Sequence, residues 1–338
     1  MKITVLGAGG FGIALAVMTS KYEHDVTLWS AFDSEIELLT EKRENQRLLP
    51  GIRLPDSVAL TTDIGCVKGC DLVIFAVPSG VLPEVAERFS DTIDPHTVVV
   101  NVGKGLEEIS LKCLSEILKE KLPHNQVVVL SGPSHAEEVA RGVPTTVVAA
   151  SVDHKAAEFV QEALMNPALR IYVNDDVVGV ELGGALKNII ALAAGIIDGL
   201  GLGDNSKAAL MTRGITEMAR LGVSLGARTE TFAGLSGIGD LIVTCTSMHS
   251  RNRRAGILIG QGSTAEEAIR EIGMTVEGYR SALCAYRLAH SVGVEMPIVN
   301  EVYRVLYEGK SAKDALADLM GRPHKHEGEE IWLYARDQ

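Results

Sequence analysis

Aromatic side chains are scarce in this chain of 338 residues, which holds 2 Trp, 6 Phe and 7 Tyr. The sequence therefore does not favour aromatic platforms on which nucleic-acid bases could stack. Leu, Ile, Val and Ala carry most of the 46% hydrophobic content, and that content is enough for a sizeable core. At about 100 to 200 residues per domain, the length predicts two domains.

Positive charge is also in short supply. The chain has 32 Lys and Arg against 44 Asp and Glu, a formal net charge of −12. Its densest basic stretch is Arg251-Asn252-Arg253-Arg254. A protein that binds a phosphate backbone needs a broad basic surface. Nucleic acid is therefore excluded as the expected partner, while this short cluster could still hold one small phosphate.

Disulfide pairs and long uncharged runs are missing as well. The five cysteines are odd in number and scattered, which favours free thiols in a reducing compartment: Cys66, Cys70, Cys113, Cys245 and Cys284. The spacing of Cys66 and Cys70 alone does not predict a metal site. No leader-like segment opens the chain, and the apolar runs fall short of the roughly 20 residues of a membrane span. We expect a cytoplasmic protein without bound metal or membrane span.

The first half alternates short β-branched runs with segments of helical spacing. The runs that predict strands are 2–6, 25–29, 71–77, 97–102, 126–130, 145–150 and 169–173. Helices are expected between them, for example at 10–22, 33–42 and 106–121. Continuously apolar strands joined by helices indicate repeated βαβ units and a mostly parallel sheet that is covered on both faces.

After residue 176 no strong strand pattern remains. Helical spacing recurs at 176–198, 206–222, 253–260, 264–271, 277–291, 297–308 and 312–319. The predicted fold class is therefore α/β, with an N-terminal Rossmann-type domain at 1–175 and an all-α domain at 176–338. The largely apolar helical domain makes a homodimer an expected assembly.

A glycine-rich turn follows the first strand and opens the first helix. It contains Gly7, Gly9, Gly10, Phe11 and Gly12, and it matches G-x-G-x-x-G in the strand–turn–helix setting that the motif requires. In such a turn the first glycine permits the bend, the second admits a pyrophosphate and the third allows close packing. The helix N-terminus attracts the diphosphate. The sequence predicts dinucleotide binding over a merely tight turn.

The end of the second predicted strand bears on the choice between NAD and NADP, because an acid there binds ribose hydroxyls and a base accommodates a 2′-phosphate. Ser30 can hydrogen-bond either form, and Asp33 is equally suited to capping the next helix. The residues lean towards NAD without deciding the preference.

Lys187 interrupts an apolar run that reads ELGGALKNIIALAAGII over residues 181–197. A lysine on an ordinary core helix extends its ammonium group to water. Here the helix is apolar nearly all round, and Gly183, Gly184 and Gly195 admit another backbone or a ligand. We expect Lys187 to face a cleft and to exchange a proton with a substrate hydroxyl.

Further polar residues cluster in two places. A glycine-rich run at 234–245 holds Asp240, which could pair with an ammonium group, and Ser250, Arg251 and Asn252 follow as donors suited to a phosphate monoester. The alternative is a capped glycine loop beside a solvated basic surface. In the first half Lys104 and the segment 131–136 follow predicted strands, at the edge where α/β proteins bind ligands.

Together these motifs resemble the bacterial-type NAD(P)-dependent glycerol-3-phosphate dehydrogenases over nearly the whole chain. The resemblance rests on GAGGFGIALA, AVPS, GKGLE, LSGPSHAEEVA, VELGGALKNIIALAAGI, TRGITEM, GLSGIGDLIVTC, SRN and VEGY, which occur in this order. It implies reversible hydride transfer between NAD(P)H and dihydroxyacetone phosphate, with formation of sn-glycerol 3-phosphate for phospholipid synthesis.

The resemblance also implies roles for individual residues. Lys187 corresponds to the proton donor and acceptor, surrounded by Lys104, Asn188, Asp240 and Thr244. Substrate-binding positions correspond to Lys104, Gly132, Ser134, Lys187, Asp240, Ser250, Arg251 and Asn252. Cofactor contacts correspond to Gly10, Phe11, Lys104, Ala136, Arg251, Thr275 and Glu277. Three residues depart from the usual family pattern: Ser30 replaces a frequent Arg or His, Gly103 a hydroxyl residue, and His135 a Phe.

Two alternatives remain open at this point. A β-hydroxyacid or 6-phosphogluconate-type dehydrogenase also joins a dinucleotide domain to a helical domain that bears a Lys-Asn pair. A non-catalytic nucleotide-sensing protein would keep the fold and lose the lysine. The retained Lys187, Lys104 and Asp240 argue against the second alternative, and the long match at 234–245 followed by SRN argues against the first.

Overall fold

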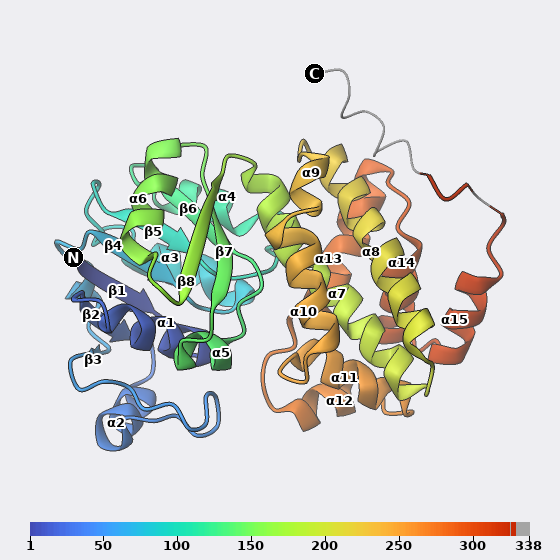
Figure 1. Cartoon of the computed structure of the whole chain (residues 1–338), viewed down its shortest axis with the longest axis horizontal. Coiled ribbons are helices and arrows are strands. Elements are labelled where there is room, and N and C mark those ends of the chain that lie inside the picture. The colour runs from blue at the N-terminus through green and yellow to red at the C-terminus, as the bar shows by residue number, and fades with distance from the viewer. Residues whose placement is uncertain (325, 329–338) are drawn as a thin grey trace. The chain divides into compact units, whose positions relative to one another are not determined.

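The computed structural model describes residues 1–324 and 326–328, and these form two compact units (Figure 1). The first unit contains Met1–Lys104 and Leu114–Val177, and the second contains Gly105–Cys113 and the described residues from Val178 onward. Each unit has its own core, and each is described separately below.

The first unit is built on one sheet of eight strands in the order β3-β2-β1-β4-β5-β6-β7-β8. The strands are β1 (Lys2–Leu6), β2 (Asp25–Trp29), β3 (Ala59–Thr61), β4 (Leu72–Phe75), β5 (Val98–Asn101), β6 (Val127–Ser131), β7 (Thr145–Ala150) and β8 (Leu169–Asn174). All neighbours pair in parallel except β6 and β7. The mostly parallel Rossmann-type sheet is confirmed; the short edge strand β3 was not predicted because three residues carry too little periodicity.

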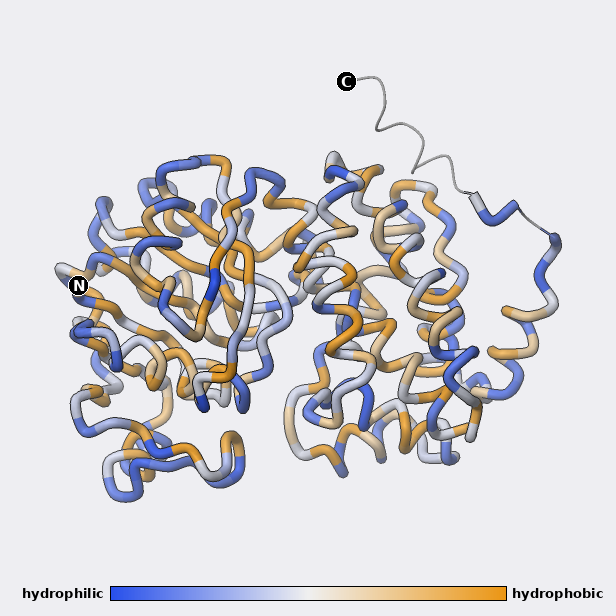
Figure 2. Tube along the Cα trace, viewed as in Figure 1, coloured by the Kyte–Doolittle hydropathy of each residue, from blue (hydrophilic) through white to orange (hydrophobic). Residues whose placement is uncertain are grey.

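Alternate strand residues bury themselves on opposite faces of this sheet, as a period of two requires. Leu72 and Ile74 enter one core cluster while Val73 and Phe75 enter the other. The first cluster includes residues of α1 (Gly10–Ser20), α5 (Ala136–Arg141) and α6 (His154–Leu164). The second includes residues of α3 (Leu82–Phe89) and α4 (Leu114–Lys121). Coverage of both faces explains why these strands are continuously apolar. The tube in Figure 2 shows the strands as hydrophobic segments between hydrophilic turns.

One predicted helix of this half is wrong over its first part. The expected helix at 106–121 exists only as α4, which begins at Leu114. The Glu107 carboxylate accepts hydrogen bonds from the N–H groups of Ile109 and Ser110, and Leu111 has a φ of 60°. This local capture of backbone donors competes with helix formation. Gly105–Cys113 is instead part of the helical unit, where Glu108 pairs with Arg280 at 2.9 Å.

The second unit is helical in all of its described residues apart from connecting loops and the Leu106–Cys113 bridge. It contains α7 (Val177–Gly199), α8 (Asp204–Ser224), α9 (Thr229–Phe232), α10 (Asp240–Thr246), α11 (Arg251–Gly260), α12 (Ala265–Ile272), α13 (Glu277–Val292), α14 (Pro297–Tyr307) and α15 (Ala312–Met320). The predicted helices from 176 to 319 are confirmed, but α9 and α10 were missed. A π-helical turn at Leu235–Gly239 leads directly into α10, so the glycine-rich run is helical and not a loop.

Helix α7 is the core of this unit. By length and composition it could cross a membrane, yet its whole apolar window is buried inside the unit. Its glycines admit other backbones: a Cβ at Gly195 would lie 2.0 Å from the carbonyl oxygen of Arg253, and one at Gly183 would lie 2.5 Å from that of Ser236. Gly256 of α11 approaches α7 in the same way, since a Cβ at Gly256 would lie 2.1 Å from the carbonyl oxygen of Leu192. Gly183 and Gly195 of α7 therefore serve helix packing.

Candidate active site

The glycine-rich turn between β1 and α1 has the backbone geometry that its sequence predicts. Gly7 has a φ of +117°, and a Cβ there would lie 2.6 Å from the carbonyl oxygen of Ala76. A Cβ at Gly12 would lie 1.9 Å from the carbonyl oxygen of Gly7. Since β4 leads to Ala76 and neighbours β1, Gly7 is required by the close approach of the turn to the next strand end, and Gly12 by the close approach of α1 to the turn itself.

Gly9 differs from these neighbours, because a Cβ there would meet nothing within 4 Å. It is the N-cap residue of α1, which has neither a side-chain cap nor an acidic residue in its first turn. The open space therefore lies above uncapped backbone N–H groups at a helix N-terminus, where an anion is favoured. The residues of this turn fit the pyrophosphate of a dinucleotide.

The strand end beside this turn holds a carboxylate that sequence reasoning missed. Ser30, predicted as a cofactor residue, is 2% exposed and donates its hydroxyl to the Glu35 carboxylate at 2.5 Å. Glu35 lies in the first turn of α2 (Asp33–Lys42). The sequence predicted only a helix at 33–42, and the approach of Glu35 to the strand end depends on how α2 follows β2.

Lys104, Gly132 and Ser134 are brought together at the carboxyl ends of β5 and β6. The Lys104 Nζ donates to the carbonyl oxygen of Gly132 at 2.9 Å, and the Ser134 hydroxyl donates to the same oxygen at 3.0 Å. Gly132 has a φ of +135°, and Ala136 begins α5 immediately afterwards. These residues form one polar group at the ligand-binding edge of the sheet.

Gly103, which departs from the family pattern, is held by Asn101. Its N–H donates to the Asn101 Oδ1 at 3.0 Å, and a Cβ at Gly103 would lie 3.2 Å from that oxygen. A side chain at this position would have to displace a neighbour by a few tenths of an ångström. The glycine therefore fits the local packing next to Lys104.

Lys187 is buried and does not extend to water. Its Nζ lies 2.6 Å from the Asp240 Oδ1 and 2.7 Å from the Thr244 Oγ1, and its side chain is 7% exposed. Asp240 begins α10 and Thr244 lies one turn later, so both reach α7 from one helix face. The ion pair compensates a charge whose burial alone would be costly. The snorkelling alternative for Lys187 is thus excluded.

Asn188 and Asn252 form a second buried chain of hydrogen bonds. The Asn252 side-chain amide donates to the Asn188 Oδ1 at 2.9 Å, and its own Oδ1 accepts from the Gly278 N–H at 2.8 Å. The chain links α7, α11 and α13. Asn252 therefore holds together the starts of α11 and α13, which carry Arg251 and Glu277. One of its two side-chain amide protons is used by Asn188, so the other is left for a phosphate.

The remaining predicted residues lie at the starts of α11 and α13. Ser250 is buried and caps α11 by accepting from the Arg253 N–H, and Arg251 is the first residue of that helix. Glu277 begins α13, and Thr275 precedes it as an exposed residue. Contacts inside the helical unit join Lys187, Asp240 and Thr244 in one group and Asn188 and Asn252 in another, while Thr275 belongs to neither.

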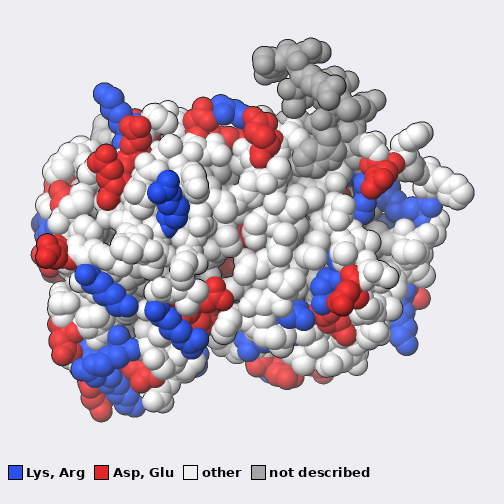
Figure 3. All heavy atoms as spheres, viewed as in Figure 1, with Lys and Arg blue, Asp and Glu red and all other residues white. Residues whose placement is uncertain are grey.

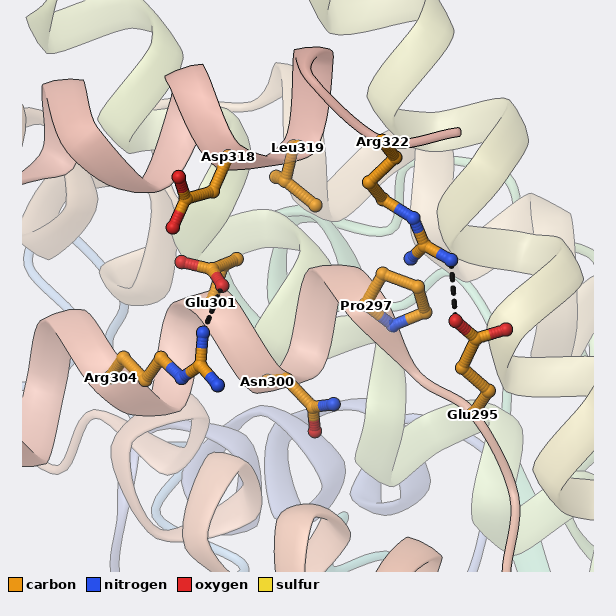
Figure 4. Close-up of a pocket in the computed structure, with 8 residues that line it drawn as sticks. All are labelled: Glu295, Pro297, Asn300, Glu301, Arg304, Asp318, Leu319 and Arg322. Carbon is orange, nitrogen blue, oxygen red and sulfur yellow. Dashed lines mark hydrogen bonds and ion pairs between the residues drawn. The ribbon is translucent and has the colours of Figure 1, made fainter. Parts of the chain in front are cut away.

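A cavity of about 220 Å³ lies elsewhere in the helical unit, between α14, α15 and the segments that precede and follow them. Figure 4 shows two ion pairs among its side chains, Arg304 with Glu301 at 2.8 Å and Arg322 with Glu295 at 2.5 Å. None of the predicted site residues lines this cavity. The third acid of the lining, Asp318, pairs with Lys310, which lies outside the lining, so each charged side chain is engaged and the cavity does not replace the Lys187 group as the candidate site.

Other classes of site find little support in the described part of the chain. No group of three or more His, Cys, Asp or Glu residues there could hold a metal ion. All five cysteines are free thiols. On the face seen in Figure 3, basic and acidic side chains are interspersed, and the group of basic side chains at the lower left, over the α2 region, is small and bordered by acidic ones.

Comparisons with known proteins agree with this arrangement. The models for the N-terminus and the C-terminus of NAD-dependent glycerol-3-phosphate dehydrogenase match residues 2–157 and 176–317. The chain is 52% identical to glycerol-3-phosphate dehydrogenase [NAD(P)+] of Desulfitobacterium hafniense, over 100% of this chain and 96% of that one. It is 54% identical to the Moorella thermoacetica protein of the same name, over 97% and 98%.

A solved structure is similar over almost the same span. The crystal structure of glycerol-3-phosphate dehydrogenase from Coxiella burnetii superposes with a TM-score of 0.92 at 38% identity, covering 95% of this chain and 99% of that one. Together, the two matched domains, the identities above 50% and the shared fold show that this chain belongs to the NAD-dependent glycerol-3-phosphate dehydrogenase family.

Proposed function

We propose that this protein reduces dihydroxyacetone phosphate to sn-glycerol 3-phosphate with NAD(P)H, reversibly, in the service of phospholipid synthesis. The observation that carries the proposal is the buried Lys187 ammonium, which is held by Asp240 and Thr244 at 2.6 and 2.7 Å in a chain of this family. The nicotinamide dinucleotide, when bound, supplies the hydride for the carbonyl carbon.

Lys187 is the proposed proton donor in this direction. As the carbonyl carbon gains the hydride, the oxygen gains negative charge, and a positioned ammonium group transfers a proton to it. In oxidation the same nitrogen takes the hydroxyl proton. Asp240 and Thr244 fix the direction of Nζ, and Asn188, next to Lys187 on α7, is tied to Asn252.

Recognition of the phosphate is assigned to the start of α11. Arg251 offers a planar fork of donors, and Ser250 and Asn252 flank it in the chain. Lys104, Gly132 and Ser134 form the proposed polarising group of the first unit. Residues 1–175 are the proposed dinucleotide-binding domain, with cofactor contacts at Gly7–Gly12, Ser30, Lys104 and Ala136, and residues 176–338 are the proposed substrate domain, which adds Arg251, Thr275 and Glu277.

A substrate panel tests this function. Purified protein should oxidise NADH or NADPH in the presence of dihydroxyacetone phosphate and should form glycerol 3-phosphate in stoichiometric amount. Turnover on 3-hydroxyisobutyrate or 6-phosphogluconate, with none on dihydroxyacetone phosphate, would reject the proposal. Cofactor binding without any turnover would favour the nucleotide-sensing alternative.

A cytoplasmic homodimer is the proposed state of the protein. Five free thiols suit a reducing compartment. A partly exposed ladder of tyrosines on α13 and α14, in which the rings of Tyr286 and Tyr303 stack at 3.8 Å, offers an apolar face for a second copy. Light scattering after size exclusion should give twice the monomer mass of 36.1 kDa, and a monomer would reject the dimer.

A further inference from the structure

The end of β2 carries a hydrogen-bonded arrangement that the family resemblance does not explain. Ser30, the first residue after β2, is 2% exposed. Its N–H donates to the carbonyl oxygen of Thr61, its hydroxyl oxygen accepts from the Phe32 N–H at 3.2 Å, and its hydroxyl proton is directed at Glu35. Ser30 thus uses its one hydroxyl proton to hold Glu35, and it could meet a cofactor only as a hydrogen-bond acceptor.

Glu35 is the group that this anchor holds. Its Oε2 receives the Ser30 hydroxyl at 2.5 Å, while none of the described residues donates a hydrogen bond to its Oε1. Asp33 adds a second, exposed carboxylate to the same first turn of α2. The strand end therefore presents negative charge beside the Gly7–Gly12 turn, at the place where Rossmann-type proteins distinguish the two dinucleotides.

The basic side chains at the end of α2 and just after it are engaged with groups other than Glu35 or lie along the helix from it. Arg43 donates to the carbonyl oxygens of Pro55 and Val58, and Arg53 pairs with Asp56 at 3.2 Å. Lys42 lies in the last turn of α2, about two helical turns beyond Glu35. Arg47 is exposed, as is Lys42, and both are side chains of this segment that could meet a phosphate.

We propose that Glu35, positioned by Ser30, makes this protein select NAD over NADP. The carboxylate accepts a hydrogen bond from a ribose hydroxyl, whereas it repels the doubly charged 2′-phosphate. The inference rests on the proposed function for the identity of the ligand class. The inference adds Glu35 as the residue that sets cofactor specificity. Glu35 lies five positions beyond Ser30, the strand-end residue that the family pattern indicates.

Equilibrium binding of the two cofactors without substrate tests this proposal independently of turnover. The dissociation constants of NADH and NADPH are measured by titration calorimetry at low ionic strength, where charge repulsion is least screened. We expect wild-type protein to bind NADH at least about tenfold tighter than NADPH. Glu35→Gln should narrow this ratio about tenfold, mainly through tighter NADPH binding, and Ser30→Ala should narrow it less.

Glu37→Gln is the matched control. Glu37 is an exposed acid on the same helix, and its substitution changes the net charge by the same amount. It should leave the ratio unchanged. Tighter binding of NADPH by the wild type would overturn the inference, as would an unchanged ratio in Glu35→Gln; loss of NADPH binding in Arg47→Ala would then identify the phosphate-binding residue. If both cofactors bind with the expected ratio and no turnover follows, the proposed function fails while the inference stands.

Discussion

The two site lysines are stabilised in opposite ways. Lys187 of the helical unit is 6% exposed and is held by a carboxylate and a hydroxyl group. Lys104 of the α/β unit is partly exposed and donates to the peptide carbonyl of Gly132. A buried ammonium group needs a compensating charge, whereas one near water does not. We therefore expect substitution at 187 to affect both folding and chemistry, and substitution at 104 to affect chemistry alone.

Lys187→Met should have the largest effect. It keeps the side-chain volume and removes the proton donor, so kcat for dihydroxyacetone phosphate should fall by about 10³-fold or more. It also leaves the Asp240 carboxylate buried without its cation, which should lower the free energy of unfolding by about 3 kcal/mol. Steady-state kinetics and urea denaturation measure the two effects.

The double variant Lys187→Met with Asp240→Asn is the control for this result. Because the amide carries no charge, the double variant should regain most of the stability, while its kcat should stay as low as that of the single variant. Recovery of activity would show that Lys187 only balances Asp240 and is not the proton donor.

Glu217 extends the comparison to a buried acid whose hydrogen-bond donors are backbone N–H groups. Burial raises the pKa of Glu217 from 4.5 to about 7, although the N–H groups of Ile298 and Val299 donate to its carboxylate. Between these two values the native state keeps a proton that the unfolded state loses. The contribution of this group to stability is therefore present below pH 4.5 and is lost as the pH rises to about 7.

The predicted loss in the free energy of unfolding is about 3 kcal/mol, and Glu217→Gln should abolish this dependence on pH. Urea denaturation of the wild type and of Glu217→Gln at pH 5 and pH 8 measures how much the free energy of unfolding of each protein changes with pH. Glu308→Gln, which changes an exposed acid, should follow the wild type. Parallel pH profiles of wild type and Glu217→Gln would contradict this assignment.

Asn252→Ala tests a neutral buried group in the helical unit. It leaves the Gly278 N–H and the Asn188 Oδ1 without the partners that they have in the wild type, at an expected cost of about 2 kcal/mol in unfolding free energy. Asn205→Ala, at an exposed position of α8, should change stability by less than about 0.5 kcal/mol. Equal effects in the two variants would show that the buried amide chain does not stabilise the unit.

Lys104→Met should have the smallest effect of the series. It removes one proposed polarising cation, so kcat/KM should fall by about tenfold while the unfolding free energy changes by less than about 0.5 kcal/mol. Lys119→Met, on an exposed part of α4, is the control for loss of one positive charge. A large loss of unfolding free energy in Lys104→Met would contradict the expectation that Lys104, unlike Lys187, affects chemistry alone.

Several site features could be read from the chain because they are local. The Gly7–Gly12 turn follows its strand directly, and the apolar setting of Lys187 is visible within seventeen residues. Other features depend on distant contacts. Lys187 meets Asp240 across 53 positions and Asn188 meets Asn252 across 64, so no periodicity predicts either pair. Glu35 was overlooked because only the path from β2 into α2 returns its carboxylate to Ser30.

The sequence by itself determined the succession of strands and helices, the dinucleotide turn and the types of residue available for catalysis, since backbone propensity and hydrophobic period act over a few neighbours. Tertiary structure decided which of these residues meet. It directed the glycines of α7 to neighbouring backbones, converted the run at 234–245 into a π-helical turn and α10, and moved Gly105–Cys113 into the helical unit. These outcomes depend on close packing and on partners for buried polar groups, and both conditions are set by segments far apart in the chain.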